Sequence, residues 1–402
     1  MINRLFIFIA FIFIFSACKT SQTVQSSKND VNKEELREEL DPKPSESLVD
    51  TTIIESKDTV IIQEEVELAI YPKEQDTISL IGVGDIMIGT NFPHEGYLPQ
   101  DSGKYMLSSV DHVLRDADLT FGNQEGVILN EGGEAKHCSD PSVCYIFRSP
   151  EYLAQHYVDA GIDMMSLANN HAGDFGETGR KNTMRVLDSL GIYHAGQLTQ
   201  PYTIFEKDRV SYGFAAFSPN NGTQSINDLE AAKGIIKHLD SLTDVIIVSF
   251  HGGAEGKKYQ HVTREREYFY GENRGNVYEF AHALIDEGAD VIFGHGPHVA
   301  RAIEVYKNRF IAYSLGNFAT YGRFNLRGEN GLAPIAKIWI TDDGYFINGK
   351  IISAVQKGAG IPEIDISHKA AQKIKELTEQ DFEDSKILID PEGNIRYIQD
   401  QF

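Results

Sequence analysis

Five short apolar segments constrain the fold of this chain more than any other feature of its sequence. They are Ile78–Val83, Leu119–Phe121, Met164–Ala168, Val245–Phe250 and Val291–Phe293. Stretches with helical spacing alternate with them, at Met106–Leu114, Pro150–Ala160, Gly179–Leu190, Asn227–Leu242 and Val277–Glu287. Buried strands that alternate with helices are typical of an α/β domain with mostly parallel strands. Three more apolar segments, 211–217, 310–314 and 335–341, follow without intervening helices, so we expect mixed or doubled sheets.

Each of the five segments runs directly into a cluster of polar side chains. The clusters contain Asp85; Glu125; Asn170, His171 and Asp174; His251 and Glu255; and His295 and His298. Because sites in open α/β sheets form at the carboxyl ends of the strands, we expect these side chains to meet in one pocket. Any one cluster by itself is explained better by a helix cap or a turn. All five together predict a site for a divalent cation, Mn, Fe, Zn or Mg, since carboxylates, amide oxygens and imidazoles are its ligands.

Composition limits the partners of the chain. Its 402 residues carry a formal net charge of −22, which argues against nucleic acid, because binding phosphates requires a basic face. With 41% hydrophobic residues the chain can bury a substantial core. Residues 18–76 are rich in Glu, Ser, Lys and Asp and contain no glycine, which predicts a flexible acidic tether before the folded domain.

The N-terminus has the pattern of a secretory signal. Arg4 is followed by an apolar run, residues 5–15, and then by Ser16, Ala17 and Cys18. Cysteine after small residues looks like the lipobox of bacterial lipoproteins, so residues 1–17 are interpreted as a signal peptide and Cys18 as the lipidated residue. An ordinary anchor helix with an incidental cysteine is the alternative. The lipoprotein interpretation places the protein in the cell envelope outside the cytoplasm, at the outer membrane or the periplasmic face.

The remaining cysteines, Cys138 and Cys144, lie close together in the sequence. In an oxidising compartment such a pair forms a disulfide that closes a small loop. A zinc site is the competing interpretation, and it is the weaker one because the chain offers no second pair of thiols.

At this point the motifs show a family resemblance. The resemblance rests on five motifs: Gly-Asp-Ile-Met at 84–87, Gly-Asn-Gln-Glu at 122–125, Ala-Asn-Asn-His at 168–171, Gly-His-Gly-Pro-His at 294–298 and Tyr-Ser-Leu-Gly-Asn-Phe at 313–318. The sequence resembles the CapA/PgsA family of poly-γ-glutamate capsule synthesis proteins, which is related to the calcineurin-like metallophosphoesterases. The resemblance covers residues 77–360 and leaves 361–402 as a C-terminal helix and strand closure. It implies a four-layer αββα sandwich with mixed sheets and a metal centre at the strand ends.

The resemblance also implies roles for single residues. The implied metal ligands are Asp85, Glu125, Asn170, His251, His295 and His298, and the implied catalytic residues are His171, Asp174 and Glu255. His171 would face the leaving group, and Glu255 would orient a ligand or bind a second ion. Either Glu125 or Asn123 matches the bridging position of the second motif. Met87 stands where the related enzymes have a histidine, so one ion and two ions both remain open.

Three functions are compatible with these residues. The first is a metal-dependent hydrolase that cleaves phosphoester or amide bonds of an acidic envelope or capsule polymer, or of a peptide. The second is a non-catalytic capsule component that binds the polymer or partner membrane proteins. The third is proton transfer at a peptide α-carbon. The basic stretch from Arg264 to Arg274 is an anion site or, equally, a solvated loop.

Overall fold

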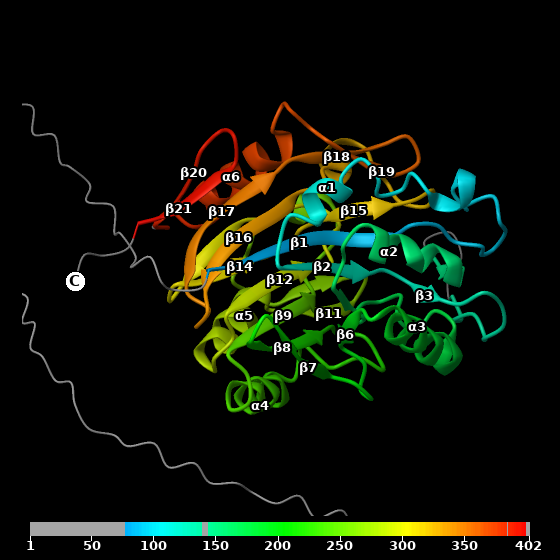
Figure 1. Cartoon of the computed structure of the whole chain (residues 1–402), viewed down its shortest axis with the longest axis horizontal. Helices are drawn as coiled ribbons and strands as arrows, with labels where there is room; N and C mark the ends of the chain where they lie inside the picture. The colour runs from blue at the N-terminus through cyan, green and yellow to red at the C-terminus, as the bar shows by residue number, and fades with distance from the viewer. Residues whose placement is uncertain (1–76, 139–143, 384, 399–402) are drawn as a thin grey trace, which may run out of the picture. The chain divides into compact units, whose positions relative to one another are not determined.

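The computed structural model describes residues 77–138, 144–383 and 385–398. These residues form two β-sheets packed face to face, with helices on the outer face of each (Figure 1). The predicted four-layer αββα sandwich with mixed sheets is therefore present. The predicted signal peptide 1–17, the lipidation site Cys18 and the tether 18–76 lie outside the described residues. Within the described part of the chain, no helix combines the length and the apolar character that crossing a membrane requires.

The larger sheet is mixed. Its strand order is β20 (Ile387–Ile389), β21 (Asn394–Tyr397), β17 (Phe346–Ile352), β16 (Ile335–Thr341), β1 (Thr77–Met87), β2 (Leu119–Gln124), β5 (Met164–Ser166) and β6 (Tyr193–Ala195), with β15 (Asn317–Thr320) also paired to β1. From β1 to β6 the strands are parallel, whereas β16, β17, β21 and β20 are antiparallel to their neighbours. The C-terminal segment thus adds two strands to the edge of this sheet.

The smaller sheet has a parallel centre and antiparallel edges. Its order is β13 (Ile303–Tyr306), β14 (Arg309–Ala312), β12 (Val291–His295), β9 (Val245–His251), β8 (Val210–Phe217) and β7 (Tyr202–Lys207). The four central strands are parallel, and β13 and β7 are antiparallel. Three small ladders lie outside both sheets: β3 (Val127–Ile128) with β4 (Arg148–Ser149), β10 (Glu267–Phe269) with β11 (Glu272–Gly275), and β18 (Ala354–Lys357) with β19 (Ile361–Ile364).

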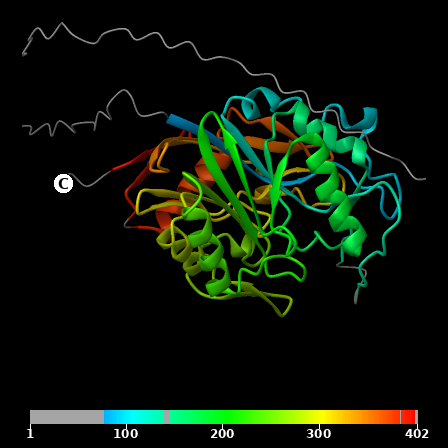
Figure 2. The ribbon, with the colours of Figure 1, turned by 60° about the horizontal axis from the view of Figure 1, so that its bottom comes forward.

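The helices cover the outer faces of the sheets. They are α1 (Asp111–Leu114), α2 (Gln155–Asp159), α3 (Gly176–Leu190), α4 (Leu229–Asp240), α5 (Val277–Asp286) and α6 (Lys369–Asp381). Helices α1 to α3 pack on the larger sheet, and α4 and α5 lie side by side on the smaller one (Figures 1 and 2). Helix α6 packs against β13, β17 and β18 and contributes apolar side chains to the core between the sheets.

Two helix predictions are wrong in extent. The expected helix 106–114 is helical only from Asp111 to Leu114, and 150–160 is a 3₁₀ turn (Glu151–Ala154) followed by α2. Between residues 103 and 110 the backbone forms short turns, in which the amide of Met106 donates to the carbonyl of Gly103 and that of Val110 to Leu107. Met106, Leu107 and Val110 are all buried, so their spacing reflects the packing of turns and not of a helix.

The core lies between the sheets and is built on the alternation of side chains along each strand. Leu80 and Phe121 belong to the cluster between the sheets, whereas Ile81 faces the helices on the outer side. The rings of Phe121 and Phe293, from opposite sheets, stack with centroids 5.3 Å apart. Gly82 makes this approach possible, because a Cβ there would lie 2.4 Å from the ring of Phe293.

Pairing at β1 decides what lies at the carboxyl end of the larger sheet. On one side, β16 pairs with the first half of β1, from Thr77 to Val83, and β15 pairs with its end, where Asp85 lies opposite Asn317. On the other side, Asp85 lies opposite Asn123 of β2. Three strands that are distant in the sequence, β1, β2 and β15, therefore deliver polar side chains to one place.

Candidate metal centre

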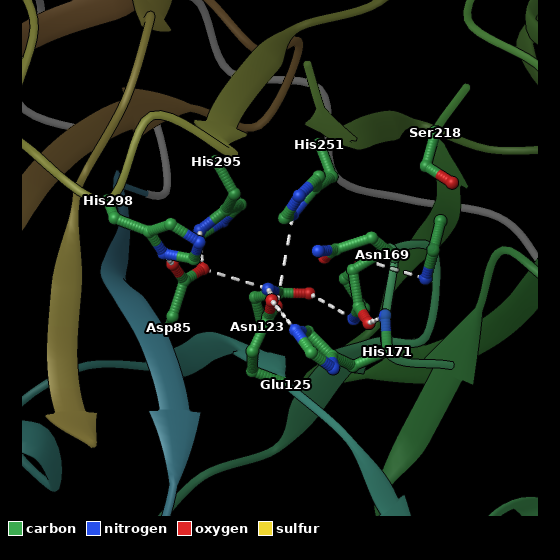
Figure 3. Close-up of polar contacts among 12 residues, drawn as sticks. Asp85, Asn123, Glu125, Asn169, His171, Ser218, His251, His295 and His298 are labelled. Atoms are coloured by element: carbon green, nitrogen blue, oxygen red, sulfur yellow. Dashed lines mark hydrogen bonds and ion pairs between the residues drawn. The ribbon is translucent and has the colours of Figure 1, made fainter. Parts of the chain in front are cut away.

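The strands end at the residues that sequence analysis selected. Asp85 lies near the end of β1, Glu125 directly follows β2, and His251 and His295 are the last residues of β9 and β12, paired with each other. These strands are one to five residues longer than their apolar runs predict, because the ladder continues through the polar side chains. All four side chains are fully buried and point into a common space (Figure 3).

Ligand-type atoms converge there. Single ligand atoms of Asp85, Glu125 and His251 lie within 4.8 Å of one another. His251 Nδ1 lies 3.8 Å from Glu125 Oε2, and Asp85 Oδ1 and Oδ2 lie 3.3 and 2.8 Å from Nδ1 of His295 and of His298. The structure therefore brings together five of the six predicted ligands, with His298 at the edge of the group.

Many of these atoms have no hydrogen-bond partner. They include Glu125 Oε1 and both ring nitrogens of His251 and of His295, all of them buried. The sixth predicted ligand, Asn170, also has a buried Oδ1 without a hydrogen bond. A buried polar atom left unpaired costs about 1–3 kcal/mol, so a protein rarely gathers several in one place. Every one is a metal-ligand atom, and this donor set fits a divalent cation.

Asn123 holds the two carboxylates together. Its Nδ2 donates to Asp85 Oδ1 and to Glu125 Oε2, both at 2.8 Å. Asn169 in turn donates from Nδ2 to Asn123 Oδ1 at 3.1 Å. The side chain of Asn123 therefore faces the carboxylates with its donor and not with its oxygen, and Glu125 is the better match to the bridging position.

The orientation of Asn169 is fixed by backbone groups, whose donor and acceptor roles cannot change. Its Nδ2 donates to the carbonyl of Gln124 at 2.8 Å, and its Oδ1 accepts from the amide of His171 at 3.0 Å. Sequence analysis named Asn123 only as the alternative to Glu125 at the bridging position, and it did not assign Asn169 to the site. The doublet Asn169-Asn170 marked the place, but only the fold shows that one amide is bonded and the other is free.

His298 has an unusual backbone. Its φ is +56°, in the left-handed region that residues other than glycine seldom occupy. Two side-chain amides secure the strained residue, because Asn317 and Asn330 both donate to its carbonyl oxygen, at 3.2 and 3.4 Å. Asn317 Oδ1 also lies 3.1 Å from His298 Nδ1. Strained residues held in this way cluster at functional sites.

His171 and Asp174 form a pair beside Glu125. Asp174 Oδ2 accepts from the amide of Phe147 at 2.7 Å and lies 2.8 Å from His171 Nδ1. Lys136 Nζ lies 2.6 Å from the other carboxylate oxygen. Because Asp174 accepts on every side, His171 carries its proton on Nδ1. Its Nε2 then faces the centre, 3.9 Å from Glu125 Oε1.

Glu255 lies apart from the ligand atoms. Its Oε1 accepts from Arg274 Nη2 at 2.5 Å, and it lines a neighbouring cavity with Asn330. Among the described residues Glu255 has an arginine partner and no hydrogen bond or ion pair with the six predicted ligands. Its charge nevertheless acts with burial to raise the pKa of Glu125 and, against burial, helps to raise the pKa of His298. The predicted disulfide between Cys138 and Cys144 is confirmed.

The two carboxyl groups are in different electrostatic states. Burial acts to raise the pKa of Asp85, but the contacts with His295 and His298 outweigh it and hold that pKa well below its usual range. Burial raises the pKa of Glu125 to about 8, and the charge of Asp85 adds to the effect. Without a cation, Asp85 is therefore charged and Glu125 holds a proton near neutral pH.

The histidines of the site also differ in their pKa values. Burial lowers the pKa of His251 well below its ordinary value, so its ring is neutral and free to bind a metal. Burial also lowers the pKa of His171, against the opposing charge of Asp174. For His298, burial acts to lower the pKa, but the hydrogen bond to Asp85 raises it to about 10.

Comparison with known families agrees with this arrangement. The family model described as "Bacterial capsule synthesis protein PGA_cap" matches residues 79–321. The chain belongs to this family. The match includes Asp85 and His298, and therefore all of the predicted metal ligands.

Several curated proteins are similar to this PGA_cap protein. Capsule biosynthesis protein CapA of Bacillus anthracis is 27% identical over 309 residues, which cover 72% of this chain and 70% of that protein. PGA biosynthesis protein CapA of Bacillus subtilis is 28% identical, over 60% of this chain and 63% of its own length. A probable polyglutamine synthesis accessory protein of Mycobacterium tuberculosis is 28% identical, over 60% of this chain and 74% of its own length.

Solved structures resemble the chain more loosely. A putative 5′-nucleotidase from Staphylococcus aureus matches with a TM-score of 0.41 and 16% identity, over 76% of this chain and 58% of that one. The NAD nucleotidase of Haemophilus influenzae matches with a TM-score of 0.38 and 11% identity, over 76% and 56%.

Metal binding should release protons. At pH 7 Glu125, with a pKa of about 8, must lose its proton to become a ligand, so affinity should rise as the pH rises from 6 to 8. Titration calorimetry with Mn²⁺ in buffers of different ionisation enthalpy should show release of about one proton or more per ion at pH 7. A calorimetric enthalpy that does not depend on the buffer, together with an affinity that does not depend on pH, would contradict this assignment.

Proposed function

We propose that this PGA_cap protein is a metal-dependent hydrolase that cleaves phosphoester or amide bonds in an acidic polymer of the cell envelope or capsule. The observation that carries the proposal is the group of buried ligand atoms that no protein group satisfies. A protein that only binds a polymer has little use for four fully buried ligand-type side chains around one space, with His298 at its edge. Asp85, Glu125, Asn170, His251, His295 and His298 would hold one or two divalent ions.

A bound divalent ion supplies an activated water and polarises the bond under attack. The residues of the chain supply the rest. Asp174 holds the proton of His171 on Nδ1, so that Nε2 is the nitrogen that exchanges a proton at the centre. When Nε2 is protonated, the neighbouring carboxylate of Asp174 stabilises the imidazolium, and the proton is positioned for the leaving group. Asp174 is thus a positioning residue for His171.

The packing around His171 supports this role. Its ring lies against that of Phe147, with centroids 4.3 Å apart, and its side chain is almost wholly buried. Lys136 Nζ lies 2.6 Å from Asp174 Oδ1 and 3.5 Å from His171 Nδ1, and its charge adds to the effect of burial in lowering the pKa of His171. A proton on Nε2 is therefore shielded from bulk water and directed to the centre, as general acid catalysis requires.

The cell envelope is the proposed location. The Cys138–Cys144 disulfide fits an oxidising compartment, and the lipobox-like sequence at Cys18 fits a lipid anchor. The CapA relatives are capsule biosynthesis proteins by name, which suggests an acidic polymer as substrate and membrane proteins of capsule synthesis as partners.

A non-catalytic role is the alternative, because one relative is described as a synthesis accessory protein. In that case the same centre would hold the polymer or stabilise a surface for partner proteins. Turnover separates the two functions, since metal binding is compatible with both.

Replacement of His171 should separate chemistry from metal binding. His171→Ala should lower kcat on a panel of phosphodiester and γ-glutamyl substrates by about 10²–10⁴-fold, the range for loss of a general acid. Metal content by elemental analysis should stay the same, because His171 is not one of the ligands. His112→Ala, a histidine on exposed α1, is the matched control and should change neither quantity.

Two results would overturn these assignments. Retained turnover in His171→Ala would remove His171 from the mechanism. Absence of turnover in the metal-loaded wild type, on every substrate of the panel, would favour the accessory role.

Lipidation can be tested on the full chain in a bacterial host. Cys18→Ser should abolish incorporation of labelled palmitate and move the protein from the membrane fraction to the soluble extracytoplasmic fraction, because a single polar side chain cannot anchor it. Cys138→Ser, at a cysteine of the disulfide, is the control and should keep the label. Palmitate label that persists in Cys18→Ser would show that Cys18 is not the lipidated residue.

A further inference from the structure

An aromatic wall borders the centre between His171 and His298. The ring of Phe147 packs on His171, and that of Phe324 lies 5.7 Å from the ring of His298. The two phenylalanine rings stack on each other, with centroids 5.1 Å apart and planes 21° apart. A substrate whose reacting bond lies between the two histidines must therefore pass along this apolar pair.

Next to the wall, one arginine lies between two tyrosines. The guanidinium carbon of Arg323, the neighbour of Phe324, lies 4.7 Å from the ring centroid of Tyr97 and 5.2 Å from that of Tyr145. Tyr145 packs on Phe147, with centroids 6.3 Å apart. The wall thus has an inner apolar pair, which touches the histidines, and an outer cationic group held by aromatic rings.

Arg323 has no carboxylate partner among the residues that the structure describes. The guanidinium is planar, always charged and held by stacking, so it loses little freedom when it binds a carboxylate or a phosphate. Other arginines near the site already have hydrogen-bond or ion-pair partners. Arg274 is buried and pairs with Glu255 and Glu272, and Arg264 donates from Nη2 to the carbonyl of Asp381 at 3.1 Å. The basic stretch singled out in the sequence therefore does not form one anion site.

Further cations lie on the other side of His298. Lys257, Lys258 and Arg327 line a cavity of about 570 Å³ together with Asn330, whose side chain donates to the carbonyl of His298. The cavity is also lined by Glu255, whose carboxylate pairs with Arg274. The net charge of the chain is −22, so its overall field repels anions. Cations that lack acidic partners at the mouth of the site counter that repulsion locally.

We infer that Arg323, held between Tyr97 and Tyr145, binds an anionic group of the substrate, a carboxylate or a phosphate, beside the bond that reacts. This inference rests on the proposed function insofar as the bound molecule is a substrate. Binding of the anion itself does not depend on turnover. It makes Arg323 a residue that sets specificity for acidic over neutral substrates.

Equilibrium binding to the full-length protein tests the inference. The probes are a γ-linked glutamate oligomer with free α-carboxylates, its neutral α-amide analogue and a glycerol phosphate oligomer. Arg323→Gln should weaken binding of at least one anionic oligomer about tenfold, the loss of one charge-assisted contact, and leave binding of the amide unchanged. Arg323→Lys should recover only part of the affinity, because lysine lacks the planar group that stacks between the tyrosines.

Arg396→Gln is the matched control. It removes one positive charge from an exposed position on β21 and should leave all three affinities unchanged. The oligomer whose affinity falls in Arg323→Gln, carboxylate or phosphate, identifies the anion. Equal affinities in wild type and Arg323→Gln, or an equal loss in Arg396→Gln, would overturn the inference.

Hydrolysis measured in parallel keeps this inference separate from the proposed function. Where an oligomer is cleaved, Arg323→Gln should raise KM about tenfold and leave kcat nearly unchanged, as expected for loss of uniform binding. Binding that depends on Arg323 without any cleavage would reject the hydrolase and keep the anion site. Cleavage with an unchanged KM in Arg323→Gln would keep the hydrolase and reject the anion site.

Discussion

Two fully buried carboxyl groups, Asp85 and Glu125, share one hydrogen-bond donor, and the site depends on this arrangement. Burying two such groups side by side is costly, and the protein offsets the cost only in part. Asn123 bridges them, His295 and His298 keep Asp85 charged, and Glu125 takes up a proton. The remaining lone pairs of Glu125, Asn170, His251 and His295 meet no protein donor. One or two divalent cations would take up these lone pairs, which would explain why so many polar atoms are gathered there.

The fold supplies this arrangement through strand ends. Parallel strands β1, β2, β9 and β12 finish at one side of the sandwich, and the switch from β16 to β15 along β1 adds Asn317. Asn317 then holds the strained backbone of His298. The inner core sets the distance between the sheets, because the stacked rings of Phe121 and Phe293 meet over Gly82. The packing between the sheets therefore also sets the distances between the side chains of the site.

Strand periodicity predicted an α/β domain with mixed or doubled sheets, and the family resemblance implied the four αββα layers. The polar residues after each strand predicted the convergence of Asp85, Glu125, His251, His295 and His298. The roles of Asn123 and Asn169 could not be predicted, because amide orientation depends on backbone groups of other strands. The helix expected at 106–114 failed because buried turns can have helical spacing. Glu255 matched a motif, but Arg274, nineteen residues away, takes its carboxylate. No sequence pattern assigned Arg323 to the site, because its position depends on Tyr97 and Tyr145 from distant segments.

Anomalous X-ray scattering from crystals grown with Mn²⁺ tests the central claim most directly. A peak at the manganese edge should lie within about 2.0–2.2 Å of oxygen and nitrogen atoms from Glu125, Asn170 and His251 or from Asp85 and His295. It should vanish in Glu125→Ala crystals if only one ion binds, and one of two peaks should vanish if two ions bind. A centre without a peak, with manganese bound only at the protein surface, would contradict the account.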